Sequence, residues 1–108
     1  MKPKNEVGDL MAVHLAELGY EFIREYKFHH SRLWRFDFLL VDSSVAVEIE
    51  GGIWSKGRHV RGAGFLADME KYNTATMQGY RVLRFSTQQV LDGSAKRFLK
   101  SWLTRSAQ

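Results

Sequence analysis

Hydrophobic residues near the N-terminus recur every three to four positions, the spacing of one helical face: Val7, Met11, Leu15 and Leu18. This spacing predicts a helix over about residues 6–18, and Gly19 is a natural stop. The pattern then changes to short apolar or alternating runs, which indicate strands. Three strands are predicted here, at 22–28, 33–41 and 45–50.

The next segment, 51–64, contains five glycines, which predict a loop. Helical spacing returns from Gly64, and this second helix is expected to end at Gly79.

The chain then continues with a predicted strand at 81–85, a candidate helix cap at Thr87 and a last helix after a break at Asp92-Gly93. The predicted order is α-β-β-β-α-β-α, in a single domain that covers residues 1–108. A hairpin followed by a helical crossover predicts an α/β fold with a mixed central sheet flanked by helices.

Three carboxylates interrupt the apolar pattern of the predicted hairpin: Asp37, Glu48 and Glu50. Because strand side chains alternate between faces, the two glutamates share a face. A two-residue turn at Asp42-Ser43 would set Asp37 opposite Glu48, and one at Ser43-Ser44 would set it opposite Glu50. A regular three-residue turn would place Asp37 on the other face. The same alternation predicts one shared face for three aromatic residues of the first hairpin strand: Trp34, Phe36 and Phe38.

Carboxylates that approach this closely repel one another unless a cation lies between them. Mg²⁺ is suited to such a site because it binds one or two carboxylates and keeps positions for water and phosphate oxygen. Without the metal, the crowded charges would strain the fold, so neutralising one should relieve strain. The alternative is that the acids form structural ion pairs with Arg35, Arg84 or Lys71.

Composition narrows the classes of function. Sixteen Lys and Arg against twelve Asp and Glu give a net charge of +4, which favours a polyanionic partner. The absence of cysteine excludes disulfides and thiol catalysis. No apolar run reaches the roughly 18 residues that span a bilayer, and there is no apolar signal segment, so no membrane partner and a cytoplasmic location are expected.

Taken in order, the motifs of this chain resemble those of the PD-(D/E)XK nuclease superfamily, and most nearly the very-short-patch-repair-like endonucleases and small phage-encoded endonucleases. The matching segments are WRFDF (34–38), VEIEGG (47–52), GRH (57–59), DMEKYN (68–73) and GYRVLRF (79–85). The resemblance implies a restriction-endonuclease-like fold and hydrolysis of DNA phosphodiester bonds with Mg²⁺, for which Mn²⁺ would substitute. It also implies a bacterial or phage-infected host cell, and a role in phage DNA processing or repair.

By matching position, the resemblance makes Asp37 the metal-bridging aspartate, Glu48 the second metal ligand, and the backbone carbonyl of Ile49 a third. The sequence departs from the motif at Glu50, which stands where the superfamily has its catalytic lysine. Some members carry glutamate there, and Lys71 could then supply the positive charge. The alternative is that Lys71 pairs with Asp68 on the helix surface.

His59 resembles a histidine that assists proton transfer or contacts phosphate in the very-short-patch-repair-like group, although the nine-residue gap from Glu50 is longer than usual there. Five basic residues bracket the acids and are predicted to contact DNA phosphates: Arg32, Arg35, Lys56, Arg58 and Arg61.

The sequence leaves open the class of function, the DNA structure that is cut and the oligomeric state. Glu50 in the lysine position would also suit a catalytically inactive nucleic-acid-binding module. A two-carboxylate glycoside hydrolase is a weaker alternative, since the basic loop would have no role. Junctions, flaps, mismatches and plain duplex are all compatible substrates, and cutting both strands would suit a symmetric homodimer.

Overall fold

The predicted strands and helices all form in the computed structural model, which describes residues 4–51 and 63–106. In chain order they are α1 (Lys4–Glu17), β1 (Phe22–Lys27), β2 (Arg35–Leu40), β3 (Val45–Glu50), α2 (Ala63–Met77), β4 (Arg81–Ser86), α3 (Thr87–Leu91) and α4 (Ser94–Ser106). The short helix α3 adds one element to the predicted order. An α/β domain with helices on a mixed sheet confirms the predicted fold class.

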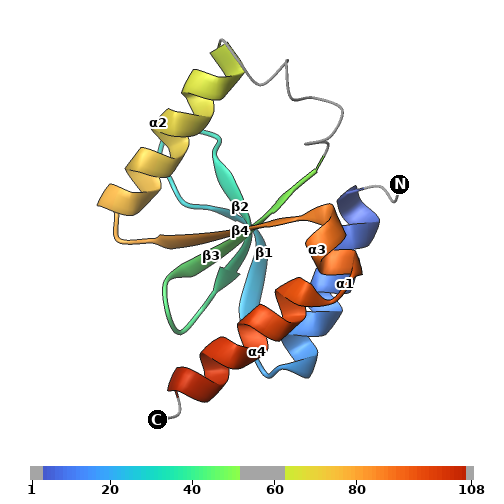
Figure 1. The fold of residues 1–108 in the computed structure, drawn as a ribbon. Helices are drawn as coiled ribbons and strands as arrows, with labels where there is room; N and C mark the ends of the chain where they lie inside the picture. The colour runs from blue at the N-terminus through green and yellow to red at the C-terminus, as the bar shows by residue number, and fades with distance from the viewer. Residues whose placement is uncertain (1–3, 52–62, 107–108) are drawn as a thin grey trace.

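The four strands form one sheet in the order β1-β2-β3-β4. The first two pairs are antiparallel, and β3 pairs with β4 in parallel. Helix α2 lies on one side of the sheet, and α1, α3 and α4 lie on the other (Figure 1). Within the described ranges, no helix is long and apolar enough to cross a membrane.

Hydrophobic side chains form a core on each side of the sheet. The larger cluster joins the sheet to α1, α3 and α4, and its fully buried members include Val7, Met11, Leu15, Phe38, Val47 and Leu99. The smaller cluster lies under α2 and consists of Phe28, Phe36, Ala46 and Ala75. Strand β3 lies between β2 and β4 and is covered on both sides. Any polar side chain on it therefore needs a hydrogen-bond or ion-pair partner.

The prediction that Phe36 and Phe38 share a face is wrong. Phe36 belongs to the cluster under α2, whereas Phe38 belongs to the cluster on the opposite side. The alternation breaks between them, at the level of Asp37. On the paired strand β1, Glu25 lies at the level of Asp37, between the pairs that Phe38 and Phe36 form with this strand. Its φ is 54°. A non-glycine residue in this left-handed region twists β1 locally, at the same level as the change of face on β2.

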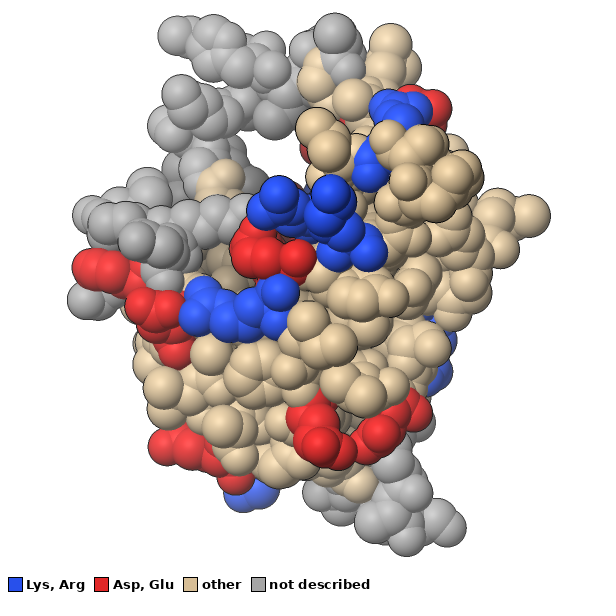
Figure 2. All heavy atoms as spheres, turned by 180° about the vertical axis from the view of Figure 1, so that it is seen from behind, with Lys and Arg blue, Asp and Glu red and all other residues tan. Residues whose placement is uncertain are grey.

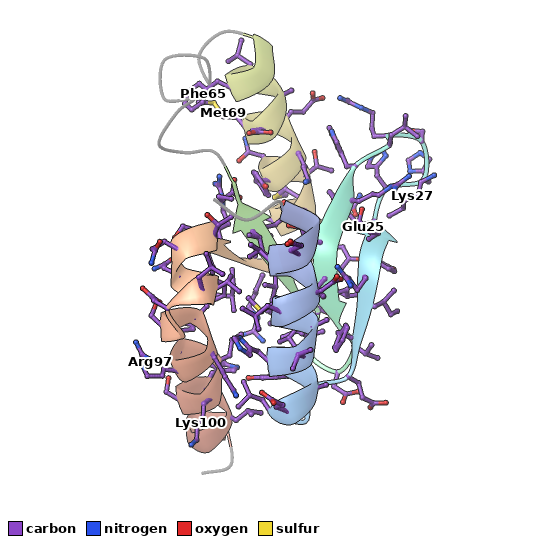
Figure 3. All side chains as sticks on the ribbon, turned by 90° about the vertical axis from the view of Figure 1, so that its right-hand side faces the viewer. Glu25, Lys27, Phe65, Met69, Arg97 and Lys100 are labelled. Atoms are coloured by element: carbon purple, nitrogen blue, oxygen red, sulfur yellow. The ribbon has the colours of Figure 1, made fainter. Side chains whose placement is uncertain are left out.

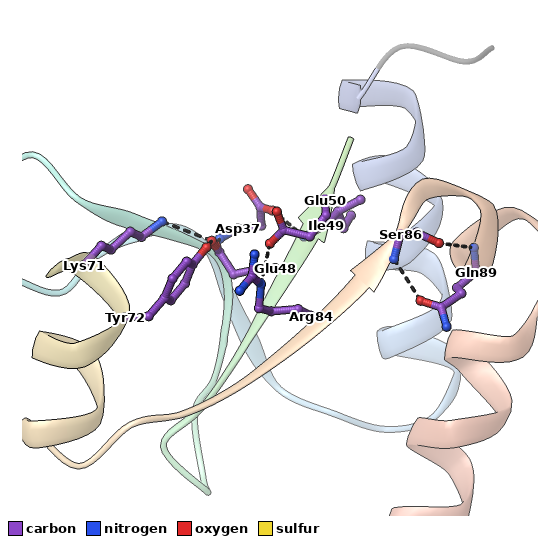
Figure 4. A network of polar contacts seen from close by, with 9 residues as sticks. All are labelled: Asp37, Glu48, Ile49, Glu50, Lys71, Tyr72, Arg84, Ser86 and Gln89. Atoms are coloured by element: carbon purple, nitrogen blue, oxygen red, sulfur yellow. Dashed lines mark hydrogen bonds and ion pairs between the residues drawn. The ribbon is translucent and has the colours of Figure 1, made fainter. Parts of the chain in front are cut away.

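The prediction that Thr87 caps a helix is also wrong by one residue. Ser86 is the N-cap of α3, because its side chain accepts a hydrogen bond from the backbone N–H of Gln89. The Gln89 side chain in turn accepts from the backbone N–H of Ser86, which completes a capping box (Figure 4).

Candidate functional site

Asp37 and Glu48 lie opposite each other on strands β2 and β3, and each carboxylate accepts a hydrogen bond from the backbone of the opposite strand. The strand register pairs Phe38 with Val47, as predicted for the turn at Asp42-Ser43, so Asp37 comes next, opposite Glu48. The backbone N–H of Asp37 donates to Glu48 Oε2 at 2.8 Å, and the backbone N–H of Ile49 donates to Asp37 Oδ2 at 2.7 Å (Figure 4).

These two hydrogen bonds begin where the backbone ladder between β2 and β3 stops, after the Phe38–Val47 pair. Carboxylate oxygens there accept the N–H groups of the neighbouring strand. Hydrogen bonds to a charged acceptor are shorter and stronger than neutral ones. Both carboxylates are therefore held in fixed orientations by the backbone of the strand opposite.

Helix α2 brings a cation and a hydroxyl to Glu48. Lys71 Nζ lies 3.0 Å from Glu48 Oε1, and the Tyr72 hydroxyl donates to the same oxygen at 2.6 Å. Ala75 is fully buried and fixes which side of α2 faces the sheet. Lys71 and Tyr72 precede it by four and three residues, so they lie on that same side one turn earlier.

The lysine is therefore an inward residue whose partner is Glu48, and the alternative pairing with Asp68 is not the one observed. The Lys71 and Glu48 side chains are only 16% and 8% exposed, so their ion pair lies largely out of water. A buried pair of this kind is weakly screened by salt, and loss of either partner leaves an uncompensated charge.

Glu50 has a cation of its own. The parallel register sets Glu48 beside Arg84 and Glu50 beside Ser86, so Arg84 can reach diagonally to Glu50. Its Nε donates to Glu50 Oε2 at 2.9 Å, and its guanidinium lies over the Tyr72 ring, 4.6 Å from the centroid. Glu48 and Glu50 thus form ion pairs with Lys71 and Arg84, as in the structural alternative, so neither acid is left without a cation.

The environment of Tyr72 keeps its hydroxyl protonated. Burial is the largest cause that raises the pKa of Tyr72, followed by its hydrogen bond to Glu48 and by the charges of Glu48 and Glu50. The neutral hydroxyl stabilises the Glu48 carboxylate by donating a hydrogen bond to it. Tyr72 therefore fixes one carboxylate oxygen at neutral pH.

The predicted metal ligands fit a hard cation by their chemistry. Asp37, Glu48 and the Ile49 carbonyl offer only oxygen atoms, and one or two carboxylates suffice for Mg²⁺ that also binds substrate phosphate. Against this, the described part of the chain holds no group of three or more His, Cys, Asp or Glu side chains placed for a metal. Glu48 would also share its oxygens with Lys71 and Tyr72.

The predicted DNA-contacting cations that the structure describes are paired with acids. Arg32 makes two hydrogen bonds to Glu70 of α2, at 3.0 and 3.3 Å, and Arg35 lies 3.7 Å from Glu25. One face of the molecule accordingly shows basic and acidic groups side by side (Figure 2). Four predicted site residues lie outside the described ranges: Lys56, Arg58, His59 and Arg61.

The sequence did not indicate a role in the site for Tyr72, and it indicated Arg84 only as one of several possible ion-pair partners. The signal for Tyr72 was its position three residues before Ala75, a small residue suited to close packing on the sheet. The role of Arg84 depends on the parallel register of β3 and β4. A helix connects these two strands, so no turn in the sequence indicates that register.

No known protein family matches this chain, and neither does any curated protein. Among solved structures, the catalytic domain of the homing endonuclease I-Bth0305I has a similar fold, with a TM-score of 0.68 over 91% of this chain and 94% of that one. The two sequences are 20% identical, so the likeness establishes a shared fold.

Proposed function

We propose that this protein is a metal-dependent endonuclease that hydrolyses phosphodiester bonds in DNA. The observation that carries the proposal is the contact of Asp37 and Glu48 across β2 and β3, with Lys71 3.0 Å from Glu48. Two carboxylates and a lysine in one site suit phosphoryl transfer, where catalysis depends on positioning and charge stabilisation. The fold shared with a homing endonuclease catalytic domain supports DNA as the substrate.

Asp37, Glu48 and the Ile49 carbonyl would hold Mg²⁺, or Mn²⁺ in its place. When bound, the metal would supply Lewis-acid polarisation of a phosphoryl oxygen. The backbone N–H groups of Asp37 and Ile49 keep the two carboxylates oriented before substrate arrives. Preorganisation of this kind lowers the cost of assembling the site during reaction.

Lys71 takes the place of the lysine that the superfamily motif would have at Glu50. Its ammonium group approaches the site from α2, on the side of Glu48 that faces that helix. A positive charge there would stabilise the negative charge that develops on the phosphoryl group. Tyr72 acts as a positioning residue, because its hydroxyl binds Glu48 Oε1 rather than an open position.

Phosphate contacts by Arg32 and Arg35 would require them to leave or share their acidic partners, Glu70 and Glu25. Both ion pairs are about half exposed, so water screens them and their loss costs little. The roles of Lys56, Arg58, His59 and Arg61 stay predictions from the sequence, as do the homodimer and a role in phage DNA processing or repair.

The contacts of Glu48 also favour a second candidate, a nucleic-acid-binding module without catalytic activity. Glu48 accepts hydrogen bonds from Lys71, Tyr72 and the Asp37 backbone, which together satisfy most of its acceptor capacity. In that case Lys71 serves as the permanent counter-ion of Glu48, and no metal enters.

A cleavage assay distinguishes the two candidates. Labelled linear, mismatched, flapped and four-way-junction DNA are incubated with the protein in Mg²⁺, in Mn²⁺ and in EDTA. A nuclease gives products only with metal, and the preferred substrate identifies the DNA structure that is cut. Binding to these DNAs without product in either metal would support the inactive module and reject the endonuclease.

A further inference from the structure

A cavity of about 410 Å³ opens beside the carboxylates, between α2 and the ends of β3 and β4. It shares Glu50, Tyr72 and Arg84 with the site described above. The rest of its lining comes from α2: Phe65, Asp68, Met69 and Asn73. The cavity therefore lies next to the proposed reaction centre, where it would meet a substrate bound there.

One part of the lining is apolar and open to solvent. Phe65 and Met69 lie one turn apart on α2, and each is 45% exposed. Figure 3 shows the two side by side near the start of the helix. Single exposed apolar side chains are ordinary, but an aromatic ring and a thioether in a concave site can bind a flat ring.

Another part of the lining is polar. Asp68 and Asn73 contribute an acceptor and an amide that both donates and accepts. Arg84 adds a guanidinium that Glu50 holds through its Nε. Asn, Asp and Arg are the side chains that pair with the edges of nucleobases, while an apolar or aromatic surface takes the base face.

We propose that this cavity binds one unstacked nucleotide of the DNA substrate, adjacent to the phosphodiester that is cleaved. The inference rests on the proposed function, because it assumes that DNA lies along the carboxylate site. Ligand pockets span roughly 300–1,000 Å³, so a cavity near the lower end suits a single nucleotide. A base inside a duplex cannot enter, and unstacking it costs a few kcal/mol, least where it is already unpaired. The preferred substrate class is therefore DNA with an unpaired or weakly paired nucleotide.

The test compares the affinity of the intact protein for three DNAs of one sequence, measured by fluorescence anisotropy in EDTA. They are a fully paired duplex, the same duplex with a one-nucleotide bulge, and a bulge that lacks its base. Base stacking on aromatic side chains predicts about tenfold tighter binding to the bulge than to the paired duplex. The abasic bulge keeps the bent backbone but should lose this preference.

Variants assign the preference to the cavity. Phe65→Ala and Met69→Ala should each lower the ratio of bulge to duplex affinity severalfold. The matched control is Met77→Ala, because Met77 is 86% exposed on the same helix and does not line the cavity. An equal preference for the base-bearing and abasic bulges, or a ratio unchanged in Phe65→Ala and Met69→Ala, overturns the inference.

Measuring cleavage and bulge preference together distinguishes failure of the nucleotide pocket from failure of the proposed endonuclease function. Metal-dependent cleavage of paired duplex with no bulge preference would reject the nucleotide pocket and keep the endonuclease. A bulge preference that depends on Phe65, without cleavage in any metal, would keep the pocket and reject the endonuclease.

Discussion

Lys71 Nζ lies 3.0 Å from Glu48 Oε1, so a lysine from helix α2 neutralises an acid on the central strand β3. The residue that follows Ile49 on this strand is Glu50, not lysine, and it is paired with Arg84. The positive charge beside Glu48 therefore comes from helix α2 and not from strand β3 itself. This arrangement leads to a measurable energetic coupling between Lys71 and Glu48.

Lys71→Met should destabilise the fold by about 3 kcal/mol, because it leaves the Glu48 carboxylate, 8% exposed, without its cation. The double variant Lys71→Met with Glu48→Gln should recover part of this loss, with a coupling energy of about 0.5–3 kcal/mol. Urea denaturation of the four proteins of this cycle gives the coupling.

The matched control is Lys96→Met, which breaks the more exposed Lys96–Glu17 pair and should cost much less stability than Lys71→Met, because water screens the pair. Equal effects of Lys71→Met and Lys96→Met would show that the Lys71–Glu48 pair is not buried in solution.

Tyr72→Phe should lower the cleavage rate, because Glu48 loses the 2.6 Å hydrogen bond that fixes its Oε1. The stability cost should be about 1.5–3 kcal/mol, as for a hydrogen bond to a charged group. Tyr20→Phe is the control, since the Tyr20 hydroxyl donates to the Leu99 carbonyl at 2.8 Å on the other side of the sheet. If both variants cleave DNA at the wild-type rate, Tyr72 has only a structural role.

Local patterns predicted the elements well, because helical spacing, strand alternation and glycine stops are encoded within a few residues. The hairpin turn even limited the register to a few choices, and one of them, Asp37 opposite Glu48, is observed. The face of Phe36 could not be predicted, because the alternation of β2 breaks beside a left-handed residue of the neighbouring strand, Glu25, which the alternation rule does not anticipate. Ion pairs between distant segments, such as Lys71 with Glu48, depend on how α2 packs, which short-range patterns do not encode.

The left-handed backbone of Glu25 should make valine destabilising at this position, although valine is normally favoured in strands. With a φ of 54°, Glu25→Val should destabilise by about 1–2 kcal/mol, because a β-branched residue clashes in the left-handed region. Glu25→Asn should be tolerated, since asparagine enters that region readily. Both variants lose the same half-exposed contact with Arg35, so their difference in thermal stability reports the backbone alone. If valine were the more stable, Glu25 would have ordinary extended geometry.

Stability should fall as the pH rises above about 10, the usual pKa of tyrosine. Burial raises the pKa of Tyr20 above that value, so the folded state keeps the phenol neutral where the unfolded chain ionises. The stability from this group is fully present below pH 10 and is lost as pH rises through the folded pKa. Melting temperatures of wild type and Tyr20→Phe between pH 8 and 11 should show a shallower decline for the variant; parallel curves would contradict the assignment.

Cleavage by Asp37→Asn tests the proposed metal-dependent site most directly. Asparagine keeps an oxygen that can accept from the Ile49 N–H, now 2.7 Å from Asp37 Oδ2, so the fold should persist with a melting temperature close to wild type. It removes the charge that a metal requires. The measurement is the rate at which each protein cuts labelled DNA in Mg²⁺, with DNA affinity and melting temperature recorded alongside. The expected result is cleavage by wild type only with metal, and none by Asp37→Asn although it still binds DNA. Equal cleavage by the two proteins would contradict the assignment of Asp37 as a metal ligand.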